Sequence, residues 1–235
     1  MLQRYPATTI YALDISSLDP DQERWKPWLG PERIGALSRF RKKKDRARCT
    51  GAGLLLAHAL KKHAPEQDVP PLTAAGANGK PYLPQLPEFQ FNISHSGRWV
   101  ICGAGNNPLG VDIEKVHRDI SAVARRCYSQ RELGCLQTLP PDRQRSALIE
   151  IWVLKESYMK ATGQGLRMPL KDLEVQLHPE LSLTRKGVKV SCAAYLCGFD
   201  DRDYRLALTV MDASPSPHYI LKQVDLKTIL DTVMS

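Results

Sequence analysis

Apolar and polar positions alternate strictly in two short segments near the middle of the chain, residues 89–94 (FQFNIS) and 109–114 (LGVDIE). Successive side chains of a strand point to opposite faces of a sheet, so each segment is predicted to be a strand with one apolar face. In the second strand, Asp112 and Glu114 occupy alternate positions. Two carboxylates are therefore expected on one face of a single strand.

Helical spacing of apolar residues predicts three helices elsewhere in the chain. The first begins at Pro31, a residue favoured in the first turn of a helix, and the others cover about 45–63 and 142–162. Gly163 follows the third helix and is placed to end it in a left-handed conformation. These helices separate the predicted strands, which is typical of a mixed fold.

The third predicted helix carries polar residues at a regular spacing. Trp152, Glu156 and Lys160 are four residues apart and share one face of that helix. The carboxylate of Glu156 and the ammonium group of Lys160 are therefore expected side by side.

Upstream, Ser129 and Glu132 are three residues apart, the spacing of a capping box that opens a short helix.

The remaining pattern completes an α+β fold in two parts. Residues 65–87 are rich in Pro, Gly and Asn and are predicted to form turns and short extended pieces. Further strands are expected over residues 8–14, 99–105, 173–177, 188–196 and 204–211. The polar break at 106–108 predicts a boundary between an N-terminal half, 1–107, and a C-terminal half, 108–235.

The composition of the chain indicates an anionic partner. The 235 residues carry a net charge of +8, and seven Lys and Arg residues lie between positions 39 and 48. Such a charge fits nucleic acid, a membrane surface, a phosphorylated small molecule or an acidic protein, and a solvated helix face explains the basic block equally well. The six cysteines include no CxxC pair, which favours reduced thiols in a cytoplasmic protein. No apolar run reaches the ~20 residues that a membrane helix needs.

The two strand carboxylates suggest a metal site. Magnesium prefers oxygen ligands, and a third carboxylate from a neighbouring helix would complete the protein side of such a site with Asp112 and Glu114. Two ordinary alternatives exist, since exposed charges on a strand are common and Glu156 with Lys160 could be a surface ion pair.

Four motifs resolve this ambiguity when they are taken together. They are GKPYLP at 79–84, FNISHSGRW at 91–99, GVDIE at 110–114 and WVLKESYMKATGQGL at 152–166. Their order and spacing closely resemble the 4'-phosphopantetheinyl transferases of the surfactin-synthetase-activating (Sfp) type. The resemblance covers residues 31–169 well and the rest loosely. It implies a monomer of two similar α/β halves related by a pseudo-twofold axis, with coenzyme A bound in the cleft between them.

The resemblance also implies a reaction and its residues. The 4'-phosphopantetheine moiety of coenzyme A passes to a carrier-protein serine, with Mg²⁺ as the metal and 3',5'-ADP as the product. The implied metal ligands are Asp112, Glu114 and Glu156. The implied coenzyme A contacts are Arg33, Arg48, Lys80, Pro81, Ser94, His95, Asp112 and Lys160. The implied catalytic residues are Glu156, Lys160 and His95, with Glu156 as the candidate base.

Two positions depart from the family pattern. Ala36 stands where the family places a further basic residue, and Cys49 stands where it places a small hydroxyl residue near the adenosine. The resemblance therefore does not predict the details of adenosine recognition.

The implied partner is an acyl or peptidyl carrier protein with an acidic helix beside its serine, and neither nucleic acid nor a membrane is expected. The predicted docking surface is a basic stretch with apolar residues in its middle. It comprises Lys115, Val116, His117, Arg118, Ile120, Val123, Arg125, Arg126 and Arg131. The alternative functions are a metal-dependent nuclease or nucleic-acid-binding protein, and a non-catalytic carrier-protein adaptor. Aromatic residues do not interleave with the basic block, as they would in a stacking platform for single-stranded nucleic acid, so the nucleic-acid functions are disfavoured. The metal-binding motif is intact, so a non-catalytic adaptor is disfavoured too.

Overall fold

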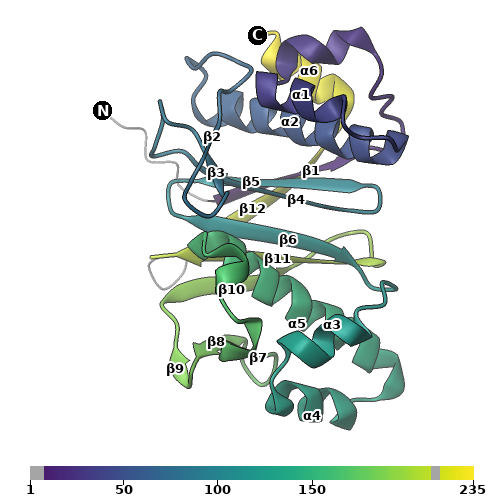
Figure 1. Ribbon diagram of the computed structural model, residues 1–235, viewed down its shortest axis with the longest axis vertical. Coiled ribbons are helices and arrows are strands. Elements are labelled where there is room, and N and C mark those ends of the chain that lie inside the picture. Colours follow the sequence, from purple (N-terminus) through teal and green to yellow (C-terminus); the bar gives the residue numbers. More distant parts are fainter. Residues whose placement is uncertain (1–7, 213–217) are drawn as a thin grey trace. The chain divides into compact units, whose positions relative to one another are not determined.

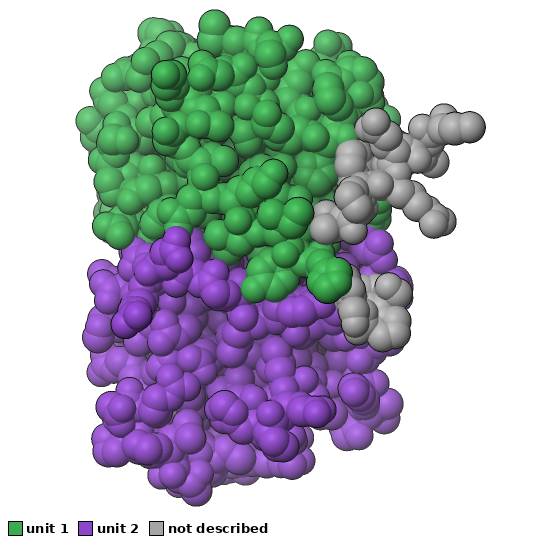
Figure 2. Space-filling model, turned by 180° about the vertical axis from the view of Figure 1, so that it is seen from behind, with its two compact units in different colours: residues 1–77, 81–106, 218–235 green, residues 78–80, 107–217 purple. Residues whose placement is uncertain are grey.

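The computed structural model describes residues 8–212 and 218–235, which fold into two compact units (Figure 2). Unit 1 contains residues up to 77, 81–106 and 218–235, and unit 2 contains residues 78–80 and 107–217. The change of unit at 106–107 lies next to the predicted boundary. Residues 218–235, which the sequence assigned to the C-terminal half, instead belong to unit 1, because their strand pairs with the first strand of the chain.

A four-stranded sheet forms the centre of unit 1. Its strands are, in spatial order, β12 (Tyr219–Val224), β1 (Thr8–Asp14), β5 (Trp99–Gly105) and β4 (Gln90–Ser96). β1 pairs in parallel with β12 and antiparallel with β5, and β4 and β5 form a hairpin. This hairpin is the predicted FQFNIS strand with its partner, and it places His95 near the turn.

Helices cover one side of this sheet (Figure 1). They are η1 (Glu23–Trp28), α1 (Pro31–Leu37), α2 (Lys43–His63) and α6 (Leu226–Val233), and a short hairpin joins β2 (Ala74–Ala75) to β3 (Pro81–Tyr82). α2 packs on β5 and against α6, with Leu54, Leu55 and Leu56 buried in the core of unit 1. Burial of these residues holds α2 in place, and α2 in turn positions Arg48 and Cys49.

Unit 2 is built around its longest helix. α5 (Pro141–Thr162) packs on a sheet whose spatial order is β10 (Cys192–Cys197), β11 (Tyr204–Met211) and β6 (Leu109–Lys115) (Figure 1). As predicted, α5 ends at Gly163, which has a φ of 64°. Glycine adopts this left-handed conformation at little cost.

Shorter elements surround α5 in unit 2. They are α3 (Ser121–Cys127), α4 (Gln130–Thr138), η2 (Gly165–Arg167), η3 (Leu170–Asp172), β7 (Leu173–Gln176), β8 (Ser182–Arg185) and β9 (Val188–Lys189). The predicted capping box opens α4, where Ser129 and Glu132 bond each other's backbone N–H groups. The strand predicted over 188–196 is instead two strands, β9 and β10. The chain turns between them, where the Cys192 N–H donates to the Val190 carbonyl.

All six cysteines are free thiols, as the absence of CxxC pairs predicted. In the described ranges, no helix combines the length and apolar composition needed to cross a bilayer.

Two buried histidines make unit 1 sensitive to acid. The pKa of His58 and of His63 is lowered to about 4, chiefly by burial and in smaller part by the charge of Lys222. An unfolded histidine has a pKa of about 6.5, so between these values the unfolded chain binds protons that the folded chain does not. We expect the free energy of unfolding to fall as the pH decreases from about 6.5 to 4, by up to about 3 kcal/mol per histidine.

Denaturant titrations at several pH values measure this effect. His63→Phe should flatten the pH dependence below about 6.5, whereas His117→Gln, at an exposed position, should leave it unchanged. If the free energy of unfolding depended on pH equally in the wild-type protein and in His63→Phe, groups other than His63 would cause the acid sensitivity.

Candidate functional site

The predicted carboxylate pair lies on β6 and is almost completely buried. Asp112 and Glu114 are each 6% exposed. A buried carboxylate is costly unless a cation or several hydrogen-bond donors compensate its charge. Each of these residues has such a partner, and the two partners differ.

Gly110 allows β6 to approach the backbone of α5 closely. A Cβ atom at this position would lie 2.0 Å from the carbonyl oxygen of Ser157 and 2.4 Å from the backbone nitrogen of Ala161. Any larger residue would therefore push the strand away from the helix. This explains why a glycine precedes the acidic pair in GVDIE.

The close contact brings Lys160 of α5 to Asp112 of β6. The Lys160 Nζ donates to Asp112 Oδ1 at 2.6 Å and to the carbonyl oxygen of Val111 at 3.2 Å. Lys160 is only partly buried, so its ammonium group remains within reach of solvent.

Glu114 is stabilised at the other end of the strand. Its carboxylate accepts hydrogen bonds from the backbone N–H of Lys115, at 3.0 Å, and from the guanidinium of Arg118. Arg118 is exposed, so this pair connects the buried acid to the surface.

Glu156 completes the acidic group from α5. Its pKa is raised to about 7, chiefly by burial and then by the charge of Asp112, with a smaller contribution from Glu114, while Lys160 and Arg118 oppose the shift. The three predicted acids are therefore close enough to repel one another electrostatically. Their oxygens suit Mg²⁺, which would relieve this repulsion. Among residues 8–212 and 218–235, however, no three His, Cys, Asp or Glu side chains form a preassembled metal cage.

Lys80 also lies in unit 2, where its side chain binds backbone carbonyls. Its Nζ donates to Leu109 and Ala161 at 3.0 Å each, and burial lowers its pKa to about 8. An ammonium group has three donors, so one remains for a phosphate. Pro81 follows at the start of β3, in unit 1.

A separate pocket of about 470 Å³ in unit 1 contains the predicted basic residues. Its walls include Arg33 of α1, Arg48 and Cys49 of α2, and His95 of β4. The Arg48 guanidinium is held by the Gly97 carbonyl at 3.2 Å and by Asp45 at 3.3 Å. The resemblance implied each of Arg33, Arg48 and His95 as a coenzyme A contact, and the structure brings the three side chains, which come from separate elements, to one pocket.

The two positions that depart from the family pattern, Ala36 and Cys49, also line this pocket. Burial raises the pKa of the Cys49 thiol, so the thiol form is favoured. Ser94 does not line the pocket, because neighbouring residues of a strand face opposite sides and His95 takes the pocket side.

Sequence analysis assigned no role to Lys155, which the structure places in the interior of unit 2. Its side chain is fully buried, and its Nζ pairs with Glu132 at 2.8 Å. The same Nζ donates to the carbonyls of Cys127, Leu170 and Leu173. Lysine is rarely buried without such partners. The only feature of the sequence that pointed to Lys155 was its position next to Glu156 in the WVLKESYMKATGQGL motif.

The comparisons with known proteins point to one family of enzymes. The family model described as "4'-phosphopantetheinyl transferase superfamily" matches residues 108–209. The 4'-phosphopantetheinyl transferase Sfp of Bacillus subtilis (strain 168) is 34% identical over 160 residues, which are 68% of this chain and 71% of the relative. A 4'-phosphopantetheinyl transferase of Bacillus pumilus is 31% identical over 175 residues, or 72% and 74% of the two chains. Another, from Bacillus subtilis, is 37% identical over 131 residues; the match spans 55% of this chain and 58% of that relative.

Proposed function

The chain belongs to the 4'-phosphopantetheinyl transferase family of the Sfp type, and from this premise we propose how its residues act. The enzyme transfers the 4'-phosphopantetheine moiety of coenzyme A to carrier proteins. The serine oxygen forms a bond to the β-phosphorus, the bond from that phosphorus to the bridging oxygen breaks, and 3',5'-ADP leaves. The serine proton must pass to a base.

We propose that Asp112, Glu114 and Glu156 hold Mg²⁺. The support is their oxygen-only chemistry, their burial, and the mutual repulsion that raises the pKa of Glu156. A bound magnesium ion neutralises charge on the pyrophosphate during transfer. Lys160 has a distinct role, because its ammonium group pairs with Asp112 and is available to a phosphate oxygen.

Glu156 is proposed to accept the serine proton, directly or through a water molecule. A base with a pKa near the working pH is best suited to this task, and the pKa of Glu156 is about 7. Metal coordination lowers the basicity of a carboxylate, so the water-mediated route suits a residue that also binds the metal.

We propose that Arg33, Arg48 and His95 in the unit 1 pocket bind the nucleotide phosphates of coenzyme A. Lys80, in unit 2, has one donor left for a phosphate. The pseudo-twofold axis, the cleft and the monomeric state stay predictions from the resemblance.

The observation that carries the assignment of the metal and phosphate groups is the contact between Lys160 and Asp112 at 2.6 Å beside two further acids. It joins the GVDIE motif to the WVLKESYMKATGQGL motif. Mass spectrometry of several apo carrier proteins, each incubated with the enzyme, coenzyme A and magnesium, tests the reaction. A gain of the phosphopantetheine mass is expected on at least one carrier, and no gain on any carrier would contradict it.

Coenzyme A is expected to raise the melting temperature, whereas a DNA duplex is not, because a ligand that binds only the folded state stabilises it. The shift should shrink in Arg33→Ala and His95→Ala, since both side chains line the unit 1 pocket. Thermal denaturation with and without coenzyme A measures this. Lys62→Ala, at an exposed position outside the pocket, should keep the full shift. If coenzyme A raised the melting temperature of both pocket variants as much as that of the wild type, the nucleotide would not bind in this pocket.

The basic surface for the carrier protein is smaller than the sequence predicted. Ile120 is 2% exposed and packs in the core of unit 2, so it is not available to a partner. Arg118 is engaged by Glu114, whereas Arg125 and Arg126 are exposed in the last turn of α3. We propose that these two arginines contact the acidic helix of the carrier.

Charge reversal tests this proposal. Arg125→Glu with Arg126→Glu is expected to raise the KM for carrier protein about tenfold or more at low salt, with little change in the KM for coenzyme A. Arg202→Glu with Lys189→Glu provides a control that reverses two exposed charges elsewhere in unit 2. Steady-state kinetics at two salt concentrations measure the KM for carrier protein and the KM for coenzyme A separately. Equal changes in both KM values would place the docking surface elsewhere.

A further inference from the structure

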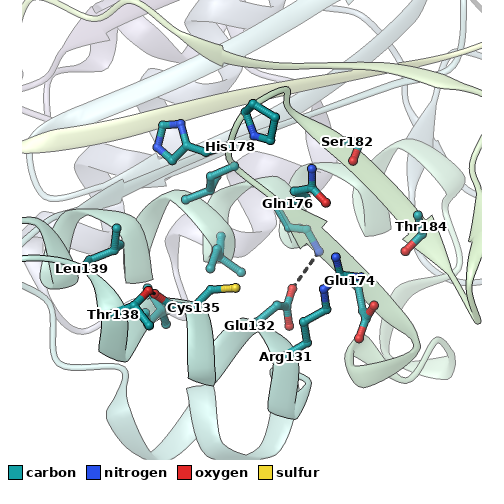
Figure 3. A pocket seen from close by; sticks show the side chains of 15 residues that line it. Arg131, Glu132, Cys135, Thr138, Leu139, Glu174, Gln176, His178, Ser182 and Thr184 are labelled. Carbon is teal, nitrogen blue, oxygen red and sulfur yellow. Dashed lines mark hydrogen bonds between the residues drawn. The ribbon is translucent and has the colours of Figure 1, made fainter.

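Unit 2 contains a second pocket of about 470 Å³ that the transfer reaction does not use (Figure 3). It lies between α4 on one side and β7, β8 and the segment between these strands on the other. None of the acids proposed to hold the metal lines it, nor does any residue of the unit 1 pocket. Its volume falls within the range of about 300 to 1,000 Å³ that small-molecule sites occupy.

Aliphatic side chains make up one part of the pocket wall. They are Leu136 and Leu139 from α4 and its end, Ile151 from α5, and Val175 and Leu177 from β7 and the residue after it. Polar side chains of β7 and β8, Gln176, Ser182 and Thr184, also line the pocket, as Figure 3 shows. An apolar wall with a few polar groups is the usual composition of a site for a small organic ligand.

Two charged side chains of opposite sign line one end of the pocket. Figure 3 shows Arg131 and Glu174 at the same end, and the backbone places them there, because their sequence neighbours Glu132 and Val175 are joined by a hydrogen bond of 2.8 Å. Within the described residues, neither Arg131 nor Glu174 forms an ion pair. Glu174 acts on Lys155 electrostatically, but Lys155 pairs with Glu132 instead.

We propose that this pocket binds small zwitterionic amphiphiles, the class that includes apolar amino acids and short peptides made of them. The ligand's carboxylate would bind the Arg131 guanidinium, its ammonium group would bind Glu174, and its apolar side chains would pack on the aliphatic wall. Gln176, Ser182 and Thr184 suit the hydrogen-bonding groups of a peptide bond.

The charge balance of the pocket excludes the coenzyme as its ligand. One arginine stands beside one glutamate, and Glu132, the other acid in the wall, is neutralised by Lys155. A nucleotide with several phosphates would meet as much negative as positive charge there. The site is therefore distinct from the one proposed for coenzyme A and does not depend on the proposed function.

The dipeptide L-leucyl-L-phenylalanine is a suitable first probe. Isothermal titration calorimetry with the intact protein, without coenzyme A or metal, should detect its binding. Cys135 lies exposed at the pocket and Gln137 is exposed on the same helix outside it, so the two positions form a matched pair. Cys135→Trp is expected to weaken binding at least tenfold by filling the pocket, whereas Gln137→Trp should not change it.

The charged ends are tested separately. Arg131→Ala should weaken binding of the free dipeptide about tenfold and leave binding of its C-terminal amide unchanged, because a charge-assisted hydrogen bond contributes about this factor. Glu174→Gln should weaken binding of the free dipeptide about tenfold and leave binding of its N-acetylated form unchanged, for the same reason. Circular dichroism confirms that each variant is folded.

Three results would overturn the proposal. The first is no binding of the free dipeptide to the wild-type protein at millimolar concentration. The second is equal weakening by Cys135→Trp and Gln137→Trp. The third is binding that is insensitive to both ends of the dipeptide, which would make the pocket a site for neutral apolar molecules. Phosphopantetheine transfer in the wild-type protein would remain in all three cases, so failure here is distinguishable from failure of the proposed function.

Discussion

Asp112→Asn and Glu156→Gln are each expected to reduce phosphopantetheine transfer about 100-fold or more while the fold is retained. Both changes keep the size of the side chain and remove one negative charge from the acidic group formed by β6 and α5. A metal that neutralises developing charge contributes several kcal/mol to a phosphoryl transfer, and each 1.4 kcal/mol changes the rate tenfold. Initial rates of transfer to an apo carrier protein, at saturating coenzyme A and magnesium, measure the loss.

Asp142→Asn is the matched control for these variants. Asp142 is exposed in the first turn of the same helix, so its charge is remote from the acidic group in sequence and open to solvent. This variant should keep the wild-type rate. If Asp112→Asn or Glu156→Gln retained more than about a tenth of the activity, that residue would not be a metal ligand.

Lys155→Met is expected to destabilise unit 2 by about 3–5 kcal/mol, because it leaves the buried carboxylate of Glu132 without its cation. The change also removes the donor of three hydrogen bonds, to the backbone carbonyls of Cys127 at the end of α3, Leu170 in η3 and Leu173 at the start of β7. Removing one member of a buried pair costs far more than removing an exposed pair. Urea denaturation followed by circular dichroism should show an earlier midpoint for unfolding.

Two further variants separate charge from packing at this position. Lys171→Met removes an exposed lysine from the neighbouring η3 and should change stability by less than about 0.5 kcal/mol. Lys155→Met combined with Glu132→Gln removes both buried charges and should recover part of the loss. A midpoint of Lys155→Met equal to that of the wild type would show that the pair does not stabilise the fold.

The local features of this fold were predictable because they depend on neighbours in sequence. The alternation in β6, the capping box at Ser129 and the left-handed Gly163 each follow from a few adjacent residues. The pairing of β12 with β1 was not predictable in this way. It joins segments about 200 residues apart, and no periodicity within either segment specifies its partner.

The candidate site shows the same division. The sequence placed Asp112 and Glu114 on one strand, but only the packing of β6 on α5 brings Lys160 to Asp112. The resemblance anticipated this grouping from motifs, without the physical reason, which is the close approach at Gly110. Lys155 was missed because a buried and an exposed lysine look alike in sequence. The difference depends on Glu132, which lies on another helix.

The order of segments in unit 1 has a consequence for synthesis of the protein. Unit 2 is encoded almost without interruption, by residues 107–217, whereas the sheet of unit 1 requires β12 and its core requires α6, both of which follow unit 2 in the chain. On the ribosome, unit 2 can therefore become complete while β1 still lacks one neighbouring strand. An unpaired strand edge is prone to pair with another chain, so the free edge of β1 is open to such pairing until residues 218–235 emerge.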